Sequence, residues 1–323
     1  MKKPIAIIAG EPNSISSEII FKSWKQRKKY TNKPIVVIGN FNLLIMQRNK
    51  LKHKIKIKKI NDNFKYKELI GNYLPVYNVN YKQNKPFINI SSKSNKFIIE
   101  CFNKALDFVN NKKILGFVNC PISKEFLFKK KYQGVTEFLS KKSGTAGNEV
   151  MLIYNKKLSV SPLTSHIPLS EVTKKLSQSK IIKKIKTINN FYKKFFKKKP
   201  KIGILGLNPH NFSPKKNFEE KKIIIPAIKK LKKFKIKAMG PMAPDTAFSL
   251  AKKYNLDVIF GMYHDQVLAP YKTMFDFNAI NITLGLPYIR ISPDHGTAEN
   301  ITGKNIANPK SLIESIKFFN YIY

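Results

Sequence analysis

Short apolar runs, spaced along the whole chain, constrain the fold most strongly. Each run holds about five or six residues, and most are rich in Ile and Val, which is typical of strands buried on both faces. Longer helical patterns lie between several of them. Alternation of this kind predicts an α/β protein with largely parallel, twisted sheets and flanking helices. The runs span residues 5–9, 35–39, 114–118, 150–154, 202–207, 258–262 and 280–284, and the helical patterns span residues 96–110, 170–196, 218–233 and 310–319.

A length of 323 residues favours two domains of ordinary size. We expect residues 1–134 and 296–323 to form a first α/β domain, residues 135–295 to form a second, and a cleft to lie between them. Ser170, followed by Glu171, is a plausible start for the longest helix. The Lys-rich segment 51–67 is compatible with a strand or a loop.

The net charge of +42 would ordinarily suggest a nucleic-acid or membrane-surface partner. The basic residues are almost all Lys, with Arg only at Arg27, Arg48 and Arg290, whereas bidentate recognition of phosphates and bases favours Arg. We therefore interpret the charge as a solvated surface and expect no nucleic-acid partner. No apolar stretch approaches about 18 residues, so we expect no membrane span. Two cysteines are too few for a disulfide scaffold and fit a reducing, cytoplasmic setting.

Three of the five histidines come just after predicted strands. His166 follows the run 158–164, His210 follows 202–207, and His264 follows 258–262. Since the carboxyl ends of strands form the ligand crevice in open α/β sheets, these imidazoles could converge on one metal ion and leave positions open for water or substrate. Any one of them alone could instead be a structural histidine. Asp265 could orient the imidazole beside it, or belong to ordinary loop chemistry.

A second group of residues is suited to binding an anion. Lys272, Asn281 and Arg290 fall within one stretch, and Arg290 lies inside an apolar segment punctuated by Gly and Pro. Arg and Lys together would hold a phosphate or carboxylate by charge-assisted hydrogen bonds. A surface ion pair is the alternative interpretation of this arginine.

Neither a G-x-G-x-x-G after the first strand nor a Walker sequence is present, so a dinucleotide would need another binding scheme. The stretch 294–298, which reads Asp-His-Gly-Thr-Ala, and the stretches 301–304 and 307–309 supply one. They resemble the adenosine-binding loop of the β-decarboxylating dehydrogenases that act on isocitrate and isopropylmalate.

Together these segments resemble the 4-hydroxythreonine-4-phosphate dehydrogenase family of pyridoxal phosphate biosynthesis. Order, spacing and total length all agree. The matching stretches are residues 10–12 (Gly-Glu-Pro), 120–124 (Cys-Pro-Ile-Ser-Lys), 136–138 (Thr-Glu-Phe), 165–169 (Ser-His-Ile-Pro-Leu), 206–210 (Gly-Leu-Asn-Pro-His), 244–246 (Pro-Asp-Thr), 263–266 (Tyr-His-Asp-Gln), 281–287 (Asn-Ile-Thr-Leu-Gly-Leu-Pro) and 294–298.

The resemblance implies a two-domain fold similar to isocitrate and isopropylmalate dehydrogenases, and NAD or NADP as hydride acceptor. It also implies oxidation and decarboxylation of 4-(phosphooxy)-L-threonine to 3-amino-2-oxopropyl phosphate in pyridoxine 5'-phosphate biosynthesis. A divalent metal, usually zinc, with magnesium or cobalt as alternatives, would be held by the three histidines, shared across a homodimer interface of the second domain.

The resemblance also implies roles for other residues. Thr136, Lys272, Asn281 and Arg290 would contact the substrate. Lys124, Asp245 and Asp265 are candidates for proton transfer or for supporting the metal ligands. The cofactor would be bound by His295, Gly296, Thr297, Ala298 and Asn308.

Two departures from the family pattern concern substrate identity. Val135 stands where the family usually has His, and Ser14 and Ser16 stand where its first loop usually has glycines. A sister dehydrogenase for phosphorylated threonate or erythronate is therefore one alternative. A three-histidine metal hydrolase is another, although a hydrolase has no need of the segment 295–309.

Overall fold

The computed structural model describes residues 3–128, 132, 134–212, 218–276 and 278–322. The chain divides into two compact units, residues 1–138 with 287–323, and residues 139–286. The first unit ends at Phe138 where residue 134 was expected and resumes at Pro287 where residue 296 was expected, so the boundaries differ by four and nine residues. Phe138 belongs to the first unit because its ring packs against those of Phe102 and Phe128. Residues 289–293 belong there because they form a strand paired with residues 116–118.

The first unit contains a parallel sheet in the order β3-β4-β2-β1-β5-β12. Its central strands β1 and β2 are buried along their whole length, as their unbroken runs of Ile, Val and Ala predict. The segment 51–67 contains a strand. The strands are β1 (Ile5–Ile8), β2 (Ile35–Gly39), β3 (Lys56–Ile60), β4 (Tyr73–Asn78), β5 (Gly116–Asn119) and β12 (Ile289–Pro293).

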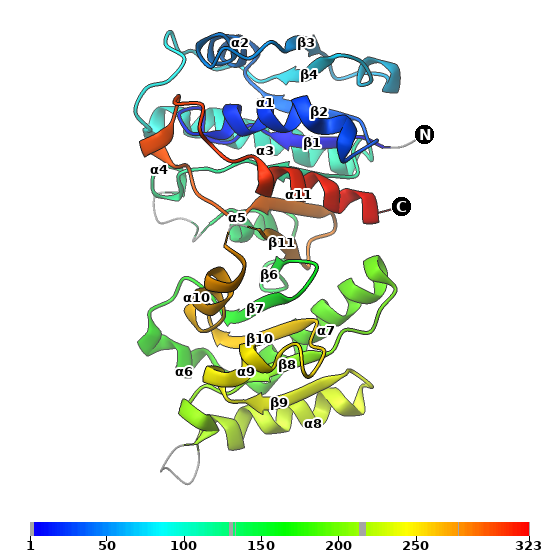
Figure 1. Cartoon of the computed structure of the whole chain (residues 1–323), viewed down its shortest axis with the longest axis vertical. Coiled ribbons are helices and arrows are strands. Elements are labelled where there is room, and N and C mark those ends of the chain that lie inside the picture. Colours follow the sequence, from blue (N-terminus) through cyan, green and yellow to red (C-terminus); the bar gives the residue numbers. More distant parts are fainter. Residues whose placement is uncertain (1–2, 129–131, 133, 213–217, 277, 323) are drawn as a thin grey trace. The chain divides into compact units, whose positions relative to one another are not determined.

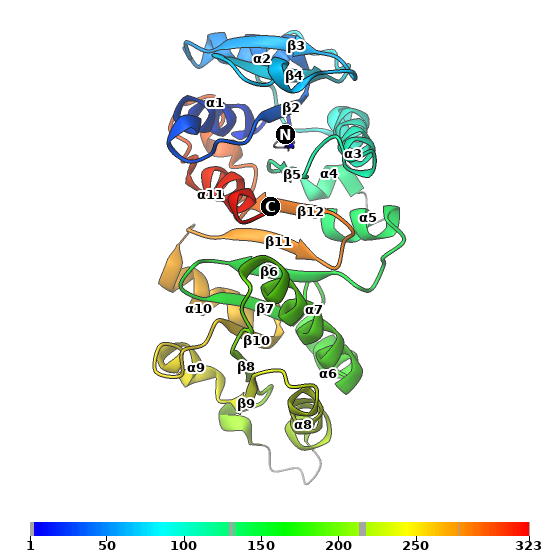
Figure 2. The same cartoon turned by 90° about the vertical axis from the view of Figure 1, so that its right-hand side faces the viewer.

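Helices cover both faces of this sheet. Figures 1 and 2 show α1 and α11 side by side on one face and α3 on the other. The apolar side chains of α3 recur at helical spacing and are buried against the sheet. The helices are α1 (Ser16–Gln26), α2 (Phe41–Lys50), α3 (Asn95–Asn110), α4 (Lys124–Phe128), α5 (Val135–Lys142) and α11 (Lys310–Phe318).

The second unit has its strands in the order β11-β6-β7-β10-β8-β9. β7, β10, β8 and β9 are parallel, whereas β6 pairs antiparallel with both β7 and β11. The expected largely parallel α/β architecture is confirmed in both units. The strands are β6 (Val150–Tyr154), β7 (Ser159–Thr164), β8 (Ile202–Leu205), β9 (Ala238–Met242), β10 (Val258–Tyr263) and β11 (Ile280–Leu284).

In the second unit α7 and α8 lie on one face of the sheet and α9 and α10 on the other (Figure 2). The predicted helix over 170–196 is wrong as one element, because the chain is extended at Leu176 and a new helix starts after Ser177. The Ser177 hydroxyl caps it by accepting a hydrogen bond from the backbone N–H of Lys180 at 3.3 Å. The helices are α6 (Val172–Lys175), α7 (Gln178–Phe196), α8 (Ile225–Lys233), α9 (Pro244–Leu250) and α10 (His264–Phe275).

Two simpler expectations can be compared with the structure directly. Cys101 and Cys120 are free thiols, both buried. Among the described residues, no helix has the length and apolar character needed to cross a membrane.

Candidate active site

The three singled-out histidines all lie beyond the carboxyl ends of parallel strands in the second unit. β7, β10 and β8 are neighbours in the sheet, and they lead into His166, His264 and His210 respectively. The register explains which of them meet. Tyr263 pairs with Thr164, so the residues that follow these two strand ends emerge side by side.

His166 and His264 form a pair. Their ring centroids are 5.5 Å apart and the ring planes are tilted by 41°. The Nδ1 of His264 lies 2.6 Å from Oδ1 of Asp265. Because a carboxylate can only accept, that nitrogen carries the proton, and in the neutral ring Nε2 keeps its lone pair for a ligand. Asp265 is therefore placed to hydrogen-bond this imidazole.

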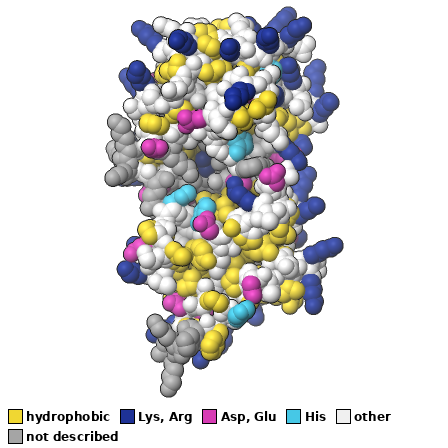
Figure 3. Space-filling view, turned by 60° about the vertical axis from the view of Figure 1, so that its left-hand side comes forward, with side chains coloured by type: hydrophobic (Ala, Val, Ile, Leu, Met, Phe, Trp, Pro, Cys, Tyr) yellow, Lys and Arg dark blue, Asp and Glu magenta, His cyan; other side chains and the backbone are white. Residues whose placement is uncertain are grey.

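His210 lies beside a different carboxylate, that of Asp245. Its Nδ1 lies 3.4 Å from Oδ2 of Asp245, and its side chain is 79% exposed. His210 lies beyond the carboxyl end of β8, as expected, and Asp245 is its neighbour. Figure 3 shows histidine side chains exposed beside acidic groups on one face of the molecule.

The three imidazoles do not assemble into a metal site within one chain. Among the side chains that the structure describes, no group of three or more His, Cys, Asp or Glu is arranged to hold a metal ion. A paired His166 and His264 would supply two ligands, so a complete three-histidine site needs a third nitrogen from elsewhere. A cluster of all three histidines within one chain is therefore absent from the described residues.

Two of the three histidines have an unusual backbone. The φ angles are 56° at His166 and 53° at His210, and Asn211 follows at 59°. Left-handed backbone is uncommon for residues other than glycine and tends to cluster where function requires a side chain to be aimed. These strained positions therefore support a functional role for both loops.

Arg290 lies in the first unit and is buried, with 3% exposure, so it does not form a surface ion pair. From β12 its Nε donates to Oδ1 of Asn119, the last residue of β5, at 2.7 Å. Its Nη1 lies 3.4 Å from the Thr136 hydroxyl at the start of α5. Burial lowers the pKa of Arg290 from 12.5 to about 10, so the guanidinium is a desolvated cation at neutral pH.

The other anticipated substrate contacts belong to the second unit. Asn281 lies on β11, and its Oδ1 is buried without a hydrogen-bond partner among the described residues. Lys272 lies in the last turn of α10 and is half-buried. The sequence grouped these two with Arg290, but the structure divides the three between its units. Lys124 begins α4, and its side chain lies outside the described part of the structure.

The first loop, at the carboxyl end of β1, is held by serine hydroxyls. Ser14 donates to the carbonyl of Glu11 at 2.7 Å, and Ser16 lies 3.4 Å from the carbonyl of Pro121. Neither serine has a positive φ, so this loop does not need glycine there. Val135, which replaces the usual histidine, is buried at the start of α5.

The segment proposed to bind the cofactor follows β12 in the first unit. The Thr297 carbonyl accepts from the backbone N–H of Ile15, and Ala298 has a φ of 49°. A side chain added at Gly296 would meet open space. The Asn308 side chain accepts from the N–H of Lys310, the first residue of α11, at 2.9 Å. Nδ1 of His295 lies 3.2 Å from the carbonyl of Gly296.

Sequence reasoning missed the residues that fix this segment. Glu18 is 1% exposed, and its Oε1 accepts from the N–H of Ala307 at 2.5 Å and from Nζ of Lys22 at 2.7 Å. Lys22 also donates to the carbonyls of Asn305 and Ala307. Glu18 and Ala307 are 289 residues apart in sequence, so no local pattern announces the contact.

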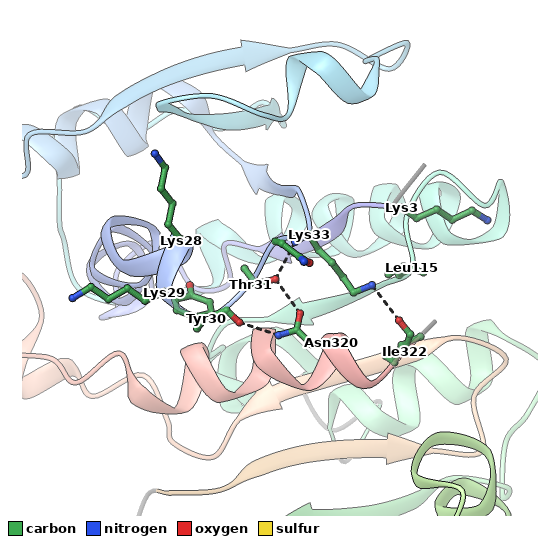
Figure 4. A pocket seen from close by; sticks show the side chains of 10 residues that line it. Lys3, Lys28, Lys29, Tyr30, Thr31, Lys33, Leu115, Asn320 and Ile322 are labelled. Carbon is green, nitrogen blue, oxygen red and sulfur yellow. Dashed lines mark hydrogen bonds between the residues drawn. The ribbon is translucent and has the colours of Figure 1, made fainter.

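A large open hollow of about 1010 Å³ lies elsewhere in the first unit, where Tyr30, Lys33 and Asn320 line it. Figure 4 shows its lysine side chains pointing in different directions, and Nζ of Lys33 donates to the carbonyl of Ile322 at 3.1 Å. Its ammonium groups do not converge on a common point. None of the anticipated site residues lines it.

Comparison with known proteins places these features in a family. The model of "Pyridoxal phosphate biosynthetic protein PdxA" matches residues 31–319. A 4-hydroxythreonine-4-phosphate dehydrogenase of Sulfurihydrogenibium is 38% identical over 97% of this chain and 96% of its own. A protein of Oceanobacillus iheyensis, provisionally named D-threonate 4-phosphate dehydrogenase, is 32% identical over 98% of this chain and 96% of its own.

Solved structures agree with this result. The 4-hydroxythreonine-4-phosphate dehydrogenase of Klebsiella pneumoniae matches with a TM-score of 0.84 and 28% identity over 98% of this chain and 97% of that chain. A β-decarboxylating dehydrogenase of Thermococcus kodakarensis matches with a TM-score of 0.50 and 12% identity over 100% of this chain and 84% of that chain. The second likeness concerns the fold alone, and it agrees with the expected architecture.

Proposed function

The chain belongs to the pyridoxal phosphate biosynthetic protein PdxA family, and we propose that it oxidises 4-(phosphooxy)-L-threonine with NAD or NADP and releases carbon dioxide to give 3-amino-2-oxopropyl phosphate. The observation that carries this proposal is 38% identity to a 4-hydroxythreonine-4-phosphate dehydrogenase along almost the whole of both chains. Oxidation of the substrate hydroxyl needs a hydride acceptor, and we assign that role to a nicotinamide cofactor. Membership of a dehydrogenase family argues against the hydrolase alternative.

We assign binding of the substrate's polar groups to Arg290, Asn281 and Lys272. Arg290, ordered by Asn119 and Thr136, presents a desolvated cation, and a charge-assisted hydrogen bond from such a group is strong. Asn281 offers a buried amide oxygen to a donor group of the substrate. Lys272 would add a second cation.

The residues present fit a divalent metal only as part of a larger ligand set. His166 and His264 supply neighbouring rings, and Asp265 fixes the tautomer of His264. We place His210, with Asp245 beside it, in the site of a second copy of the chain, which makes the enzyme a homodimer with shared sites. Zinc, or magnesium or cobalt in its place, would supply Lewis-acid activation of the substrate hydroxyl and of the oxygen that gains charge as carbon dioxide leaves.

The nicotinamide cofactor is assigned to the segment 295–308. Gly296 leaves room for close approach of a ligand to the backbone, and Glu18 and Lys22 hold the segment from α1. A ligand bound there would meet a preorganised backbone, which reduces the ordering cost of binding. A nicotinamide held there would supply a hydride acceptor for oxidation of the substrate hydroxyl, whose product would be a β-keto acid prone to lose carbon dioxide.

A second candidate substrate is D-threonate 4-phosphate. The relative of Oceanobacillus iheyensis is also similar along the whole chain. Val135 is buried and apolar where the family usually has a histidine, so one hydrogen-bonding group around the substrate is missing. A binding site that loses a polar partner changes its discrimination between analogues that differ by one polar group.

One spectrophotometric comparison tests both candidates. The purified enzyme is supplied with NAD or NADP and a divalent metal, and reduced cofactor is followed with 4-(phosphooxy)-L-threonine and with phosphorylated threonate and erythronate. We expect the highest kcat/KM with 4-(phosphooxy)-L-threonine. His210→Ala should lose metal-dependent turnover while circular dichroism stays native. Reduction of neither cofactor by any of these substrates would contradict the proposed function.

A further inference from the structure

A buried carboxylate lies directly beneath the loop that carries His210. Glu220 is 1% exposed and belongs to a turn of π-helix, residues 220–224, that precedes α8. Its Oε1 accepts from the backbone N–H groups of Leu207 and Asn208, at 2.7 and 2.8 Å. Its Oε2 accepts from the side-chain amide of Asn208 at 2.9 Å. One carboxylate therefore satisfies three donors of the residues that lead into His210.

This loop is also fixed from other elements. Gln266, two residues after His264, donates to the carbonyl of Gly206 at 2.7 Å and accepts from the N–H of Met262 at 2.7 Å. The side-chain amide of Asn211 donates to the carbonyl of Pro241 at 3.0 Å. The chain before and after His210 is therefore anchored to α10 and β9 as well as to Glu220.

Such anchoring is needed because the backbone at this point is strained. His210 and Asn211 have successive left-handed φ angles of 53° and 59°. A residue in this region persists only when its surroundings impose it. Space is also limited, since a Cβ on Gly206 would lie 1.9 Å from Oδ1 of Asn211 and 3.0 Å from Oε1 of Glu220. A side chain at residue 206 would therefore displace the Asn211 amide and crowd the Glu220 carboxylate, and glycine leaves both groups in place.

We infer that Glu220 is the positioning residue that presents the His210 imidazole, by fixing the backbone of residues 207–208 with its carboxylate. The inference rests on the proposed function, in which His210 is a metal ligand. A carboxylate is suited to the task because its oxygens accept hydrogen bonds, and three donors converge on them. An amide in its place would direct an N–H toward one of those donors. Glu220→Gln therefore changes one atom and breaks the arrangement.

Metal titration of four proteins tests this inference. Co²⁺ is added to the metal-free forms of the parent, Glu220→Gln, His210→Ala and a control, Glu171→Gln, and binding is followed by visible absorption. The Glu171 side chain forms an exposed ion pair with Lys174 and lies outside the loop that carries His210, so its change of charge matches that of Glu220 without touching that loop. Loss of a group that orients a metal ligand raises the metal dissociation constant by about 10-fold to 100-fold. We expect that increase for Glu220→Gln and no change for Glu171→Gln.

Amide hydrogen exchange supplies a readout that does not depend on metal or activity. The N–H groups of Leu207 and Asn208 should be protected in the parent and exchange faster in Glu220→Gln, while the N–H groups of β10 keep their protection. If Glu220→Gln does not fold, Asn208→Ala keeps both backbone donors and removes the side-chain amide that donates to Glu220 and also to Glu219. It should give a smaller loss of cobalt affinity in the same direction.

The outcomes separate the inference from the proposed function. Parent-like cobalt affinity in Glu220→Gln, together with weakened binding in His210→Ala, would overturn the inference and leave His210 as a ligand. Parent-like affinity in His210→Ala would remove the ligand assignment, and the role of Glu220 with it. Weakened cobalt binding in Glu220→Gln and in His210→Ala, with faster exchange at Leu207 and Asn208 in Glu220→Gln, supports the role of Glu220 and the assignment of His210 as a ligand.

Discussion

Replacing Arg290 with methionine should weaken substrate binding far more than folding. Burial lowers the pKa of Arg290 from 12.5 to about 10, which corresponds to a burial penalty of roughly 3 kcal/mol on the charged form. Against this stand its hydrogen bonds to Asn119 and Thr136, of which only the first is short. Each is worth about 1 to 3 kcal/mol when the donor is charged. Methionine removes the penalty and the bonds together, so the free energy of unfolding should stay within about 2 kcal/mol of the parent.

The effect on the substrate has no such compensation. Loss of the guanidinium removes charge-assisted hydrogen bonds to an anionic group, worth about 3 kcal/mol together. That loss corresponds to an increase in KM on the order of 100-fold. KM is measured from the absorbance of reduced cofactor, and unfolding is measured in urea. Arg48→Met is the matched control, because Arg48 donates to the carbonyl of Ile55 and to Asn49 at the surface, and it should change neither quantity.

The opposite result would refute this reasoning. If Arg290→Met loses more than about 4 kcal/mol of unfolding free energy while KM is unchanged, the arginine braces β12 against β5 and does not bind substrate.

Three further predictions follow from the same contacts. Burial raises the pKa of Glu11 above 4.5, so ionising this carboxyl destabilises the folded state, and the destabilisation is absent near pH 4 and grows as pH rises. The stability of Glu11→Gln in urea unfolding should therefore increase relative to that of the parent between about pH 4 and pH 7. A difference in stability that does not change with pH would contradict this. Cys101 and Cys120 are buried and burial raises both thiol pKa values, so a thiol reagent should label neither before unfolding. Ser177→Ala should lower unfolding free energy by about 1 kcal/mol through loss of the α7 cap, as measured by thermal unfolding; no change would show that the cap contributes nothing.

The sequence predicted the sheet and the histidine positions because both follow from local patterns. Buried strands carry unbroken apolar runs, and parallel pairing carries His166 and His264 to the same edge whatever the loops contain. The break between α6 and α7 was missed, because the apolar pattern continues across Leu176 and only the cap at Ser177 interrupts the helix.

Other features were beyond sequence reasoning because they depend on contacts between distant residues. Arg290 meets Asn119 across 171 residues of sequence, and such a contact creates no periodicity. Glu220 lies 12 residues beyond Asn208, in a segment whose helical pattern gives no reason to single out one carboxylate. Lys272 and Asn281 belong to one unit and Arg290 to the other, and neighbourhood in sequence did not indicate that division.

The central claim is that two copies of the chain contribute histidines to one metal site. Mixing of inactive variants tests it most directly. His210→Ala is denatured and refolded with an equal amount of His264→Ala, and formation of reduced cofactor is measured with metal present. If the ligands come from both subunits, half of the dimers are mixed and each contains one intact site, so about one quarter of the parent activity should return. Absence of activity in every pairing of His166→Ala, His210→Ala and His264→Ala, with dimers formed, would contradict the claim.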